Sequence, residues 1–436
     1  MEERSILHHE RKREKAMGLF KNGAVYSEFS PAGILLRLER LRQKKGQKEV
    51  CYGICVVSYL SKIERGMVKP DENLVEQLFA RLGIVYERED AFLAESRSLL
   101  DSYIYNLTYG LKNEEVCQKL WQRENRLLWS PLALDTLLVL GMECVFRSAG
   151  VSGGKQISEY VSVLEELKEH MNGRQFSYYC LIRAELEKKP QSGLVYRKRA
   201  SEGLNNTLGL RSLIYGYCAA DEYNEIHRLE QRFTALALEE GNVYALADYY
   251  FMNATAYACV NMEEMMTVYY EKVRHLLQNT GWWEETADDW NYNMGATYLE
   301  LGKYDLALKY LEQVQQKHFL LWHKKARLNL RLGNREAAEE LMVKMEKQLA
   351  ETPQPEEADR LMLKELKMEG EPGFLENPEY LAVLEELFAA LRKERNFGFL
   401  YQYKEVAMEA FARQRKYKKA LEFQKEISLK VQKGVC

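Results

Sequence analysis

The sequence predicts an all-α protein, with an N-terminal helix-turn-helix bundle followed by a tetratricopeptide-like α-superhelix. The chain of 436 residues contains only 8 prolines and 26 glycines, the two residue types that disfavour helices most strongly. Hydrophobic residues make up 46% of the chain and charged residues 29%, as in a globular protein rather than a disordered one. From about residue 90 onward, amphipathic helical patterns alternate with turn signals, and no convincing strand is found.

A chain of this length exceeds one compact core, so more than one domain is expected. Residues 1–29 are a charged N-terminal extension without the apolar segment of a secretory signal. Residues 30–86 form the predicted helix-turn-helix domain, and residues 90–436 the predicted repeat domain. The first helix of the head is expected to begin at Ser30 and Pro31, with the serine as N-cap and the proline in the first helical position.

The stretch 47–70 has the spacing of a helix-turn-helix. Gln47 opens a short helix, Gly53 lies in the turn, and a second helix ends at Gly66. Such a pair presents its second helix to the major groove of DNA, where exposed side chains reach bases and nearby cations hold phosphates. Glu64 is expected to cap or pair locally. The predicted DNA-binding residues are Gln47, Lys48, Val57, Ser58, Tyr59, Lys62, Arg65 and Lys69. The alternative is a helical hairpin with no role in nucleic-acid binding.

Charge is unevenly distributed along the chain. Residues 31–85 carry ten lysines and arginines against six acidic residues, an excess of +4 in a chain whose net charge is −3. A basic head on an acidic body suits phosphate binding confined to the head. An excess this small is also common on an ordinary surface of mixed charge.

Enzyme and metal signatures are absent from the sequence. There is no GxSxG or HExxH motif, and residues 150–156 only superficially resemble a phosphate loop. The eight cysteines include no CxxC pair, which favours a reducing cytoplasm over a disulfide framework. The most apolar run, 134–146, is too short to span a bilayer. We therefore expect a cytoplasmic protein that is not an enzyme, with no catalytic residues, cofactor, metal or membrane partner.

Internal repetition supports the repeat domain. Leu301-Gly302-x4-Ala307 recurs 31 residues later as Leu332-Gly333-x4-Ala338, and the pattern that starts at Tyr304 recurs at Tyr417. Small residues let paired helices approach closely, as in tetratricopeptide-type pairs, which stack into a superhelix with a concave groove. The proline-containing stretch 351–377 is predicted to be a long loop.

Residues 34–84 resemble the Xre/Cro-type helix-turn-helix, with GIC-x-VSYLSKIERG-x-x-x-P as the characteristic run. With its helical repeat body, the chain resembles the peptide-responsive regulators of Gram-positive bacteria, the Rgg, PlcR and PrgX group called RRNPP. The resemblance implies quorum sensing, in which a re-imported peptide binds the groove and changes how a homodimer presents its heads. Gly46 and Val56 stand where the family usually has helix-capping residues, and each lost cap costs ~1 kcal/mol.

The repeat register suggests which side chains face the groove. If Gly295 and Gly302 mark their usual places, Asn293 faces inward, and the same alignment selects residues on other inner helices. Asparagine can hold peptide amides, and arginine can hold a peptide carboxylate. The predicted peptide-binding residues are Arg211, Tyr215, Asn253, Asn293 and Arg327. The alternative is that these side chains make ordinary hydrogen bonds between helices.

The sequence thus predicts a sequence-specific transcription regulator that binds double-stranded promoter DNA as a homodimer and is controlled by a short linear peptide. Dimerisation is expected because specific sites are usually paired half-sites. The alternative is a helical-repeat interaction scaffold whose head is vestigial or tethers it to DNA.

Overall fold

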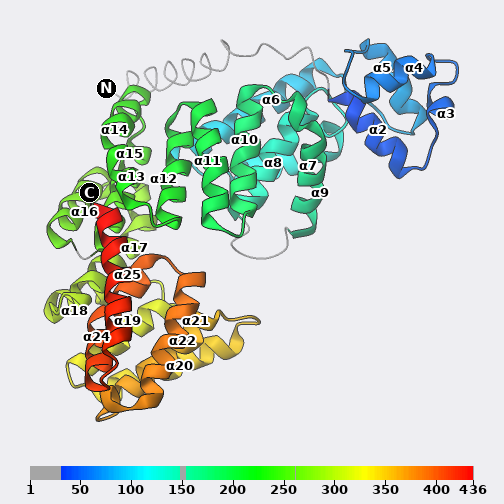
Figure 1. The fold of residues 1–436 in the computed structure, drawn as a ribbon. Helices are drawn as coiled ribbons and strands as arrows, with labels where there is room; N and C mark the ends of the chain where they lie inside the picture. The colour runs from blue at the N-terminus through cyan, green and yellow to red at the C-terminus, as the bar shows by residue number, and fades with distance from the viewer. Residues whose placement is uncertain (1–30, 148–153, 261, 436) are drawn as a thin grey trace, which may run out of the picture. The chain divides into compact units, whose positions relative to one another are not determined.

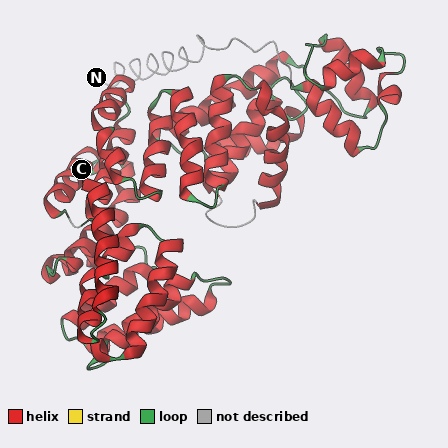
Figure 2. Ribbon diagram, viewed as in Figure 1, coloured by secondary structure: helices red, strands yellow, loops and turns green. Residues whose placement is uncertain are grey.

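The computed structural model describes residues 31–147, 154–260 and 262–435, and every regular element within these ranges is a helix (Figure 1; Figure 2). The predicted all-α fold class is confirmed. The N-terminal extension lies outside the described residues. So do residues 150–153, part of the stretch that only superficially resembles a phosphate loop. In the described part of the chain, no helix combines the length and apolar character needed to cross a lipid bilayer.

The chain divides into two compact units, residues 1–209 and 210–436. This division leaves the predicted boundary at residues 86–90 a prediction, because the head helices fall in the same unit as the first helices of the body. The helices of the first unit are α2 (Ala32–Arg42), α3 (Gln47–Cys51), α4 (Val57–Glu64), α5 (Glu72–Arg81), α6 (Asp90–Tyr109), α7 (Glu114–Leu127), α8 (Ala133–Arg147), α9 (Gly154–Leu167), η1 (Lys168–His170), α10 (Gly173–Leu186) and α11 (Pro190–Leu204).

The four head helices α2 to α5 enclose a core that includes Leu36, Leu60, Ile63 and Phe79. Gly33 lets α2 approach the end of α4, since a Cβ there would lie 2.0 Å from the carbonyl oxygen of Ile63. Such a contact excludes any side chain, so the absence of a Cβ at Gly33 allows α2 to pack closely against the end of α4.

The ends of the head helices follow the sequence signals with one shift. Asp71 caps α5, where its carboxylate accepts hydrogen bonds from the backbone N–H groups of Asn73 and Leu74 at 3.0 and 3.4 Å. Gly53 takes φ +72° in the turn before α4, a conformation that favours glycine. However, α2 begins at Ala32 with Pro31 as its N-cap, one residue later than predicted, and Ser30 lies outside the described residues.

The rest of the first unit is built around α8, which packs against α6, α7, α9 and α10. Leu120, Leu140, Leu164 and Ile182 are completely buried in this core. Helix α2 also packs against α9, and Arg37 pairs with Glu166 between them. The head therefore rests directly on the first helices of the body.

The second unit continues with paired helices. They are α12 (Thr207–Ala219), which begins just before the division, α13 (Tyr223–Arg228), α14 (Glu230–Glu240), α15 (Val243–Ala258), α16 (Glu263–Leu277), α17 (Gly281–Glu300), α18 (Tyr304–Gln313), α19 (Phe319–Arg331), α20 (Arg335–Glu351), α21 (Glu357–Glu369), η2 (Phe374–Glu376), α22 (Pro378–Glu394), α23 (Phe397–Tyr401), α24 (Lys404–Arg413) and α25 (Tyr417–Val435).

Helices α15, α17, α19 and α21, which we call the A layer, are neighbours of one another, and each packs on the helix that follows it. Ala307 and Ala338 are completely buried between the paired helices, as the repeat pattern predicts. A Cβ at Gly295 would lie 2.6 Å from Cγ of Leu311, which explains the small residue on α17. The predicted repeats at 288–350 are therefore confirmed as stacked helix pairs.

The predicted loop at 351–377 is wrong, because α21 occupies Glu357–Glu369. Pro353 and Pro355 precede this helix and Pro372 follows it, so the prolines lie at its ends and not within it. Between them, Ala358, Met362 and Leu366 are completely buried at helical spacing. The prolines at both ends of this stretch made the sequence look like a loop, although its apolar residues have the spacing of a helix.

The C-terminal helices return toward the start of the second unit. Helix α25 packs against α13, as Figure 1 illustrates with the red helix running toward α13. Nζ of Lys430 on α25 donates to Asp221, in the turn before α13, at 2.8 Å. The first and last helical pairs of this unit are thus in contact.

Candidate functional site

Helix α4 exposes one face. Ser58 and Lys62 are exposed and Val57 lies at its N-terminal end, also exposed. Leu60 and Ile63, on the opposite face, are buried in the head core. A helix held by one face in a small core leaves the opposite face available for a DNA groove.

The cations around α4 are exposed as well. Lys48 on α3 and Lys69 after α4 are exposed, and Nε of Arg65 donates to the carbonyl oxygen of Ser61 at 3.1 Å. Tyr59 is half-buried and packs against the head core. Among the predicted DNA-binding residues, Tyr59 therefore also contributes to the packing of the head core.

Glu64 does not pair locally as expected. Its two carboxylate oxygens accept from Nε and Nη2 of Arg40 on α2, at 2.6 and 2.8 Å. Nε2 of Gln47, a predicted DNA contact at the start of α3, also donates to Glu64 at 2.8 Å. The Glu64 carboxylate on α4 therefore connects this helix to α2 through Arg40 and to α3 through the Gln47 amide.

Sequence reasoning missed two features of the turn between α3 and α4. Tyr52 in this turn is 78% exposed, unusual for an aromatic side chain in a small domain. Arg81 on α5 donates to the carbonyl oxygens of Glu49 and Tyr52 at 3.2 and 2.9 Å. Arg81 therefore fixes the turn that carries Tyr52. An aromatic residue beside the turn glycine was the available signal.

Neither short helix of the motif has a side-chain cap. Gly46 and Val56 are the N-cap residues of α3 and α4, and neither makes a capping hydrogen bond. The side-chain caps that the sequence lacks at these positions are therefore absent from the structure as well.

In the second unit, Arg211 and Tyr215 on α12 converge on Asp248 of α15. Nε of Arg211 donates to one carboxylate oxygen at 2.9 Å, and the Tyr215 hydroxyl donates to the other at 2.8 Å. The guanidinium also lies 4.8 Å from the ring centre of Tyr244. Burial acts to lower the pKa of the Arg211 guanidinium, but Asp248, Tyr244 and Tyr215 together outweigh burial and leave that pKa raised. These two predicted residues therefore share one partner.

The two predicted asparagines have other partners. Asn253 is completely buried and bonds through Oδ1 to Nδ1 of His227 on α13. Asn293 on α17 is half-buried and hydrogen-bonds Tyr270 on α16. In this structure both side chains make contacts between helices, which is the alternative interpretation of these residues.

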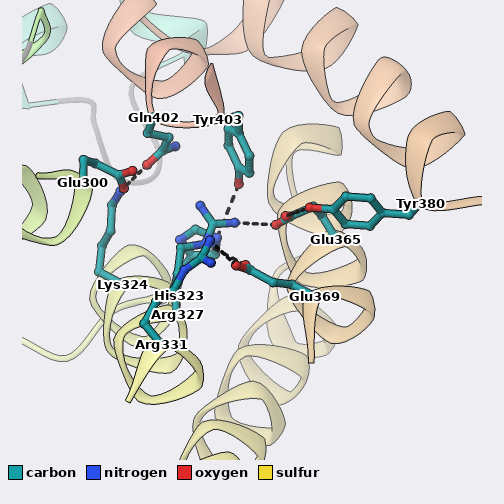
Figure 3. A network of polar contacts seen from close by, with 10 residues as sticks. All are labelled: Glu300, His323, Lys324, Arg327, Arg331, Glu365, Glu369, Tyr380, Gln402 and Tyr403. Carbon is teal, nitrogen blue, oxygen red and sulfur yellow. Dashed lines mark hydrogen bonds and ion pairs between the residues drawn. The ribbon is translucent and has the colours of Figure 1, made fainter. Parts of the chain in front are cut away.

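Arg327 lies in a buried polar network (Figure 3). The side chain is 4% exposed, and it pairs with Glu365 and Glu369 on α21. Arg331 pairs with Glu369, and the Tyr380 hydroxyl donates to Glu365 at 2.8 Å. Nearby, Nζ of Lys324 pairs with Glu300 on α17 at 3.0 Å. Nε and Nη2 of the Arg327 guanidinium are thus each bound by a carboxylate of its own chain.

Burial dominates the titration of this network. It raises the pKa of Glu365 to about 7, although Arg327 acts in the opposite direction. Burial lowers the pKa of Lys324, which Glu300 partly offsets. His323 on α19 is completely buried, and burial together with the cations Arg327 and Lys324 holds its pKa well below 6.5. The network therefore favours a neutral histidine at neutral pH.

Within residues 31–147, 154–260 and 262–435, no group of three or more metal-ligating side chains is found. Cys51 and Cys55 are free thiols. The geometry consequently directs attention to the α4 face in the head and to the A layer in the second unit.

Comparison with known proteins gives one informative structural match. No family model matches the chain, and no curated protein matches it either. Among solved structures, it is similar to the apo form of the quorum sensor NprR from B. thuringiensis, with a TM-score of 0.56 and 17% sequence identity. The match covers 78% of this chain and 99% of that chain. The chain therefore shares the all-helical fold of that protein.

Proposed function

We propose that this protein is a transcription regulator that binds promoter DNA through α4 and is controlled by a short peptide bound to the helical repeats. The observation that carries the proposal is the α4 face. Ser58 and Lys62 are exposed on it while Glu64, on the same helix, is anchored to α2 by Arg40. A rigidly held helix with an exposed polar face is what base recognition requires.

The repeats supply the controlling part of the proposal. The structurally similar NprR is named a quorum sensor, and quorum sensing in the RRNPP group works through peptides. An operator made of two half-sites needs two heads, so the proposed DNA-binding form is a homodimer. Its proposed location is the cytoplasm. A peptide that prefers one arrangement of the repeats would change operator affinity roughly 5–150-fold, for a coupling of ~1–3 kcal/mol.

The head assignment is tested by removing two cations from α4 and its C-terminal end. The double variant Lys62→Ala/Arg65→Ala should lose binding to a duplex that the wild-type protein selects from a random library. Both side chains are exposed, so the thermal unfolding midpoint should hardly change. Electrophoretic mobility shift and differential scanning fluorimetry measure the two quantities.

The matched control is Lys344→Ala/Lys347→Ala, which removes the same charge from exposed positions on α20. The control should bind the selected duplex as the wild type does. If both double variants bind normally, the α4 face is not the DNA-reading surface, and the interaction-scaffold alternative becomes the better account.

A further inference from the structure

Residues 396–403, which we call the strap, link α22 to α24 and include the short helix α23. The strap begins beside the start of the second unit, where the backbone N–H of Phe397 donates to Oδ1 of Asp221 at 2.9 Å. The next residue, Gly398, lies against Cys259 at the end of α15, since a Cβ on Gly398 would be 2.7 Å from Sγ of Cys259. The strap therefore touches the first helix of the A layer.

The other end of the strap lies on α19 (Figure 3). Nζ of Lys324 donates to the side-chain oxygen of Gln402. The guanidinium of Arg327 stands 4.6 Å from the ring centre of Tyr403, and the Tyr403 hydroxyl is 3.4 Å from Nε2 of His323. An eight-residue segment thus reaches from α15 to α19, across the A layer.

These contacts resemble those that hold a bound peptide. The Asp221 carboxylate accepts a hydrogen bond from a backbone N–H of the strap, and Lys324 donates to the side-chain amide oxygen of Gln402. The Arg327 guanidinium lies over the aromatic ring of Tyr403. The partners are remote in sequence, with separations from 76 residues for Arg327 and Tyr403 to 176 residues for the Asp221 contact. Arg327 is also one of the residues that the sequence predicts for peptide binding.

The fit of the strap leaves polar atoms without partners. Nδ1 of His323 and Nε2 of Gln402 are buried, and neither has a hydrogen-bond partner among the described residues. Leaving such a group unpaired costs free energy that a better ligand could recover. The strap also contains only one helix, of five residues, which is too short to be stable by itself.

We propose that the strap is a displaceable internal occupant of the A layer, and that a short peptide with aromatic side chains binds by replacing it. This inference rests on the proposed function and specifies its ligand. The ligand offers a backbone N–H to Asp221, an acceptor to Lys324 and an aromatic ring to Arg327. The ligand binds only those molecules in which the strap has left the A layer. The apparent affinity for the ligand therefore falls as the fraction of molecules with the strap in place rises.

The test uses a labelled synthetic peptide with the sequence of residues 396–403, added to the full-length protein. Its binding is measured by fluorescence anisotropy without DNA. The wild type should bind this probe weakly, because its own strap competes. Gly398→Ala inserts a Cβ against Cys259 and should unseat the strap, so the variant should bind the probe about tenfold more tightly or better.

Two controls make the test specific. The double variant Gly398→Ala/Cys259→Ala removes the sulfur that the new Cβ meets, so the strap should seat again and the affinity should return toward the wild-type value. A probe of the same composition in scrambled order should not bind Gly398→Ala. Equal, weak binding of the probe by the wild type and by a folded Gly398→Ala variant would overturn the proposal.

Hydrogen exchange on the wild type decides the matter even if the variant fails to fold. Amides of residues 396–403 should exchange faster than those of α19, since a displaceable segment opens without global unfolding. Exchange as slow as in α19 would mark the strap as permanent core and contradict the proposal. Because neither readout uses DNA, a failed operator test would leave this inference standing, and the reverse also holds.

Discussion

Arg40 and Glu64 form a two-point ion pair that joins α2, the first helix of the head, to α4. The side chains are 10% and 2% exposed, and hydrogen bonding to Glu64 raises the pKa of Arg40. Two parallel hydrogen bonds fix both distance and orientation. The exposed face of α4 is therefore held in place from its buried side, next to the side chains proposed to reach DNA.

Glu64→Ala should destabilise the head, because it leaves the buried Arg40 charge without a carboxylate, with the carbonyl oxygen of Lys45 as its remaining partner. Breaking such a pair costs roughly 3–5 kcal/mol. Hydrogen exchange in residues 57–64 should accelerate, and DNA binding should weaken as a consequence. The double variant Arg40→Met/Glu64→Met should recover much of the protection, since no charge remains buried. Unchanged exchange in Glu64→Ala would show that the pair does not hold α4.

Val56→Ser should stabilise the head by ~1 kcal/mol, because it supplies the missing cap of α4. Val56 has extended backbone angles, φ −81° and ψ 148°, and is 68% exposed, so little burial is lost. The midpoint of thermal or urea unfolding of the head measures the gain. Val57→Ser makes the same chemical change one residue inside the helix and should give no gain. Equal effects at the two positions would remove capping as the explanation.

Gly295→Ala should destabilise the second unit by roughly 1–3 kcal/mol, as expected for overpacking. The new Cβ would meet Cγ and Cδ2 of Leu311 at 2.6 and 2.8 Å, with the helix α18 backbone close behind. Gly281→Ala, at the start of the same helix, meets nothing within 4 Å and should be neutral or slightly stabilising. Comparison of their unfolding midpoints isolates close packing from helix propensity.

These predictions mark how far the sequence could lead. Local signals were reliable: Gly53 lies in its turn with a positive φ, and buried Ala307 and Ala338 follow the repeat. Such features depend on residues that are close in the sequence, so the spacing of residue types along the chain is enough to predict them. The helix α21 was missed because prolines at both of its ends looked like a loop.

Long-range contacts could not be predicted in the same way. Arg40 and Glu64 are 24 residues apart, and each reads as an ordinary surface charge in an amphipathic helix. The partners of the strap are up to 176 residues away, so no periodicity indicates them. Arg327 was placed on an inner helix face, but its burial between Glu365 and Glu369 depends on how α19 and α21 pack. The peptide-binding assignments remain predictions.

Acid should destabilise the second unit through His323. Its pKa is depressed in the folded protein because of burial and the nearby cations, so the unfolded chain binds a proton that the folded protein does not. This contribution to stability is present above pH 6.5 and is lost below it, at no more than about 1.4 kcal/mol per pH unit. His323→Gln should remove that loss.

The measurement is the difference in unfolding midpoint between wild type and His323→Gln at pH 7.5 and 5.5 (roughly one unit either side of the ordinary histidine pKa). Glu365 acts in the opposite sense, since its pKa is raised from 4.5 to about 7 and its protonated form stabilises the folded state on the acid side. It is common to both proteins, so the difference isolates the histidine. His275→Gln, exposed on α16, should not change the pH dependence. A similar difference at both pH values would contradict the assignment.

The central claim is that this protein reads a specific DNA sequence, and an anisotropy titration over a salt series tests it most directly. The purified protein is titrated against a labelled duplex from its own upstream region and against a scrambled duplex. The account predicts tight binding that falls steeply with salt and exceeds the scrambled control by roughly a thousandfold or more. Weak binding that is equal for both duplexes would contradict it.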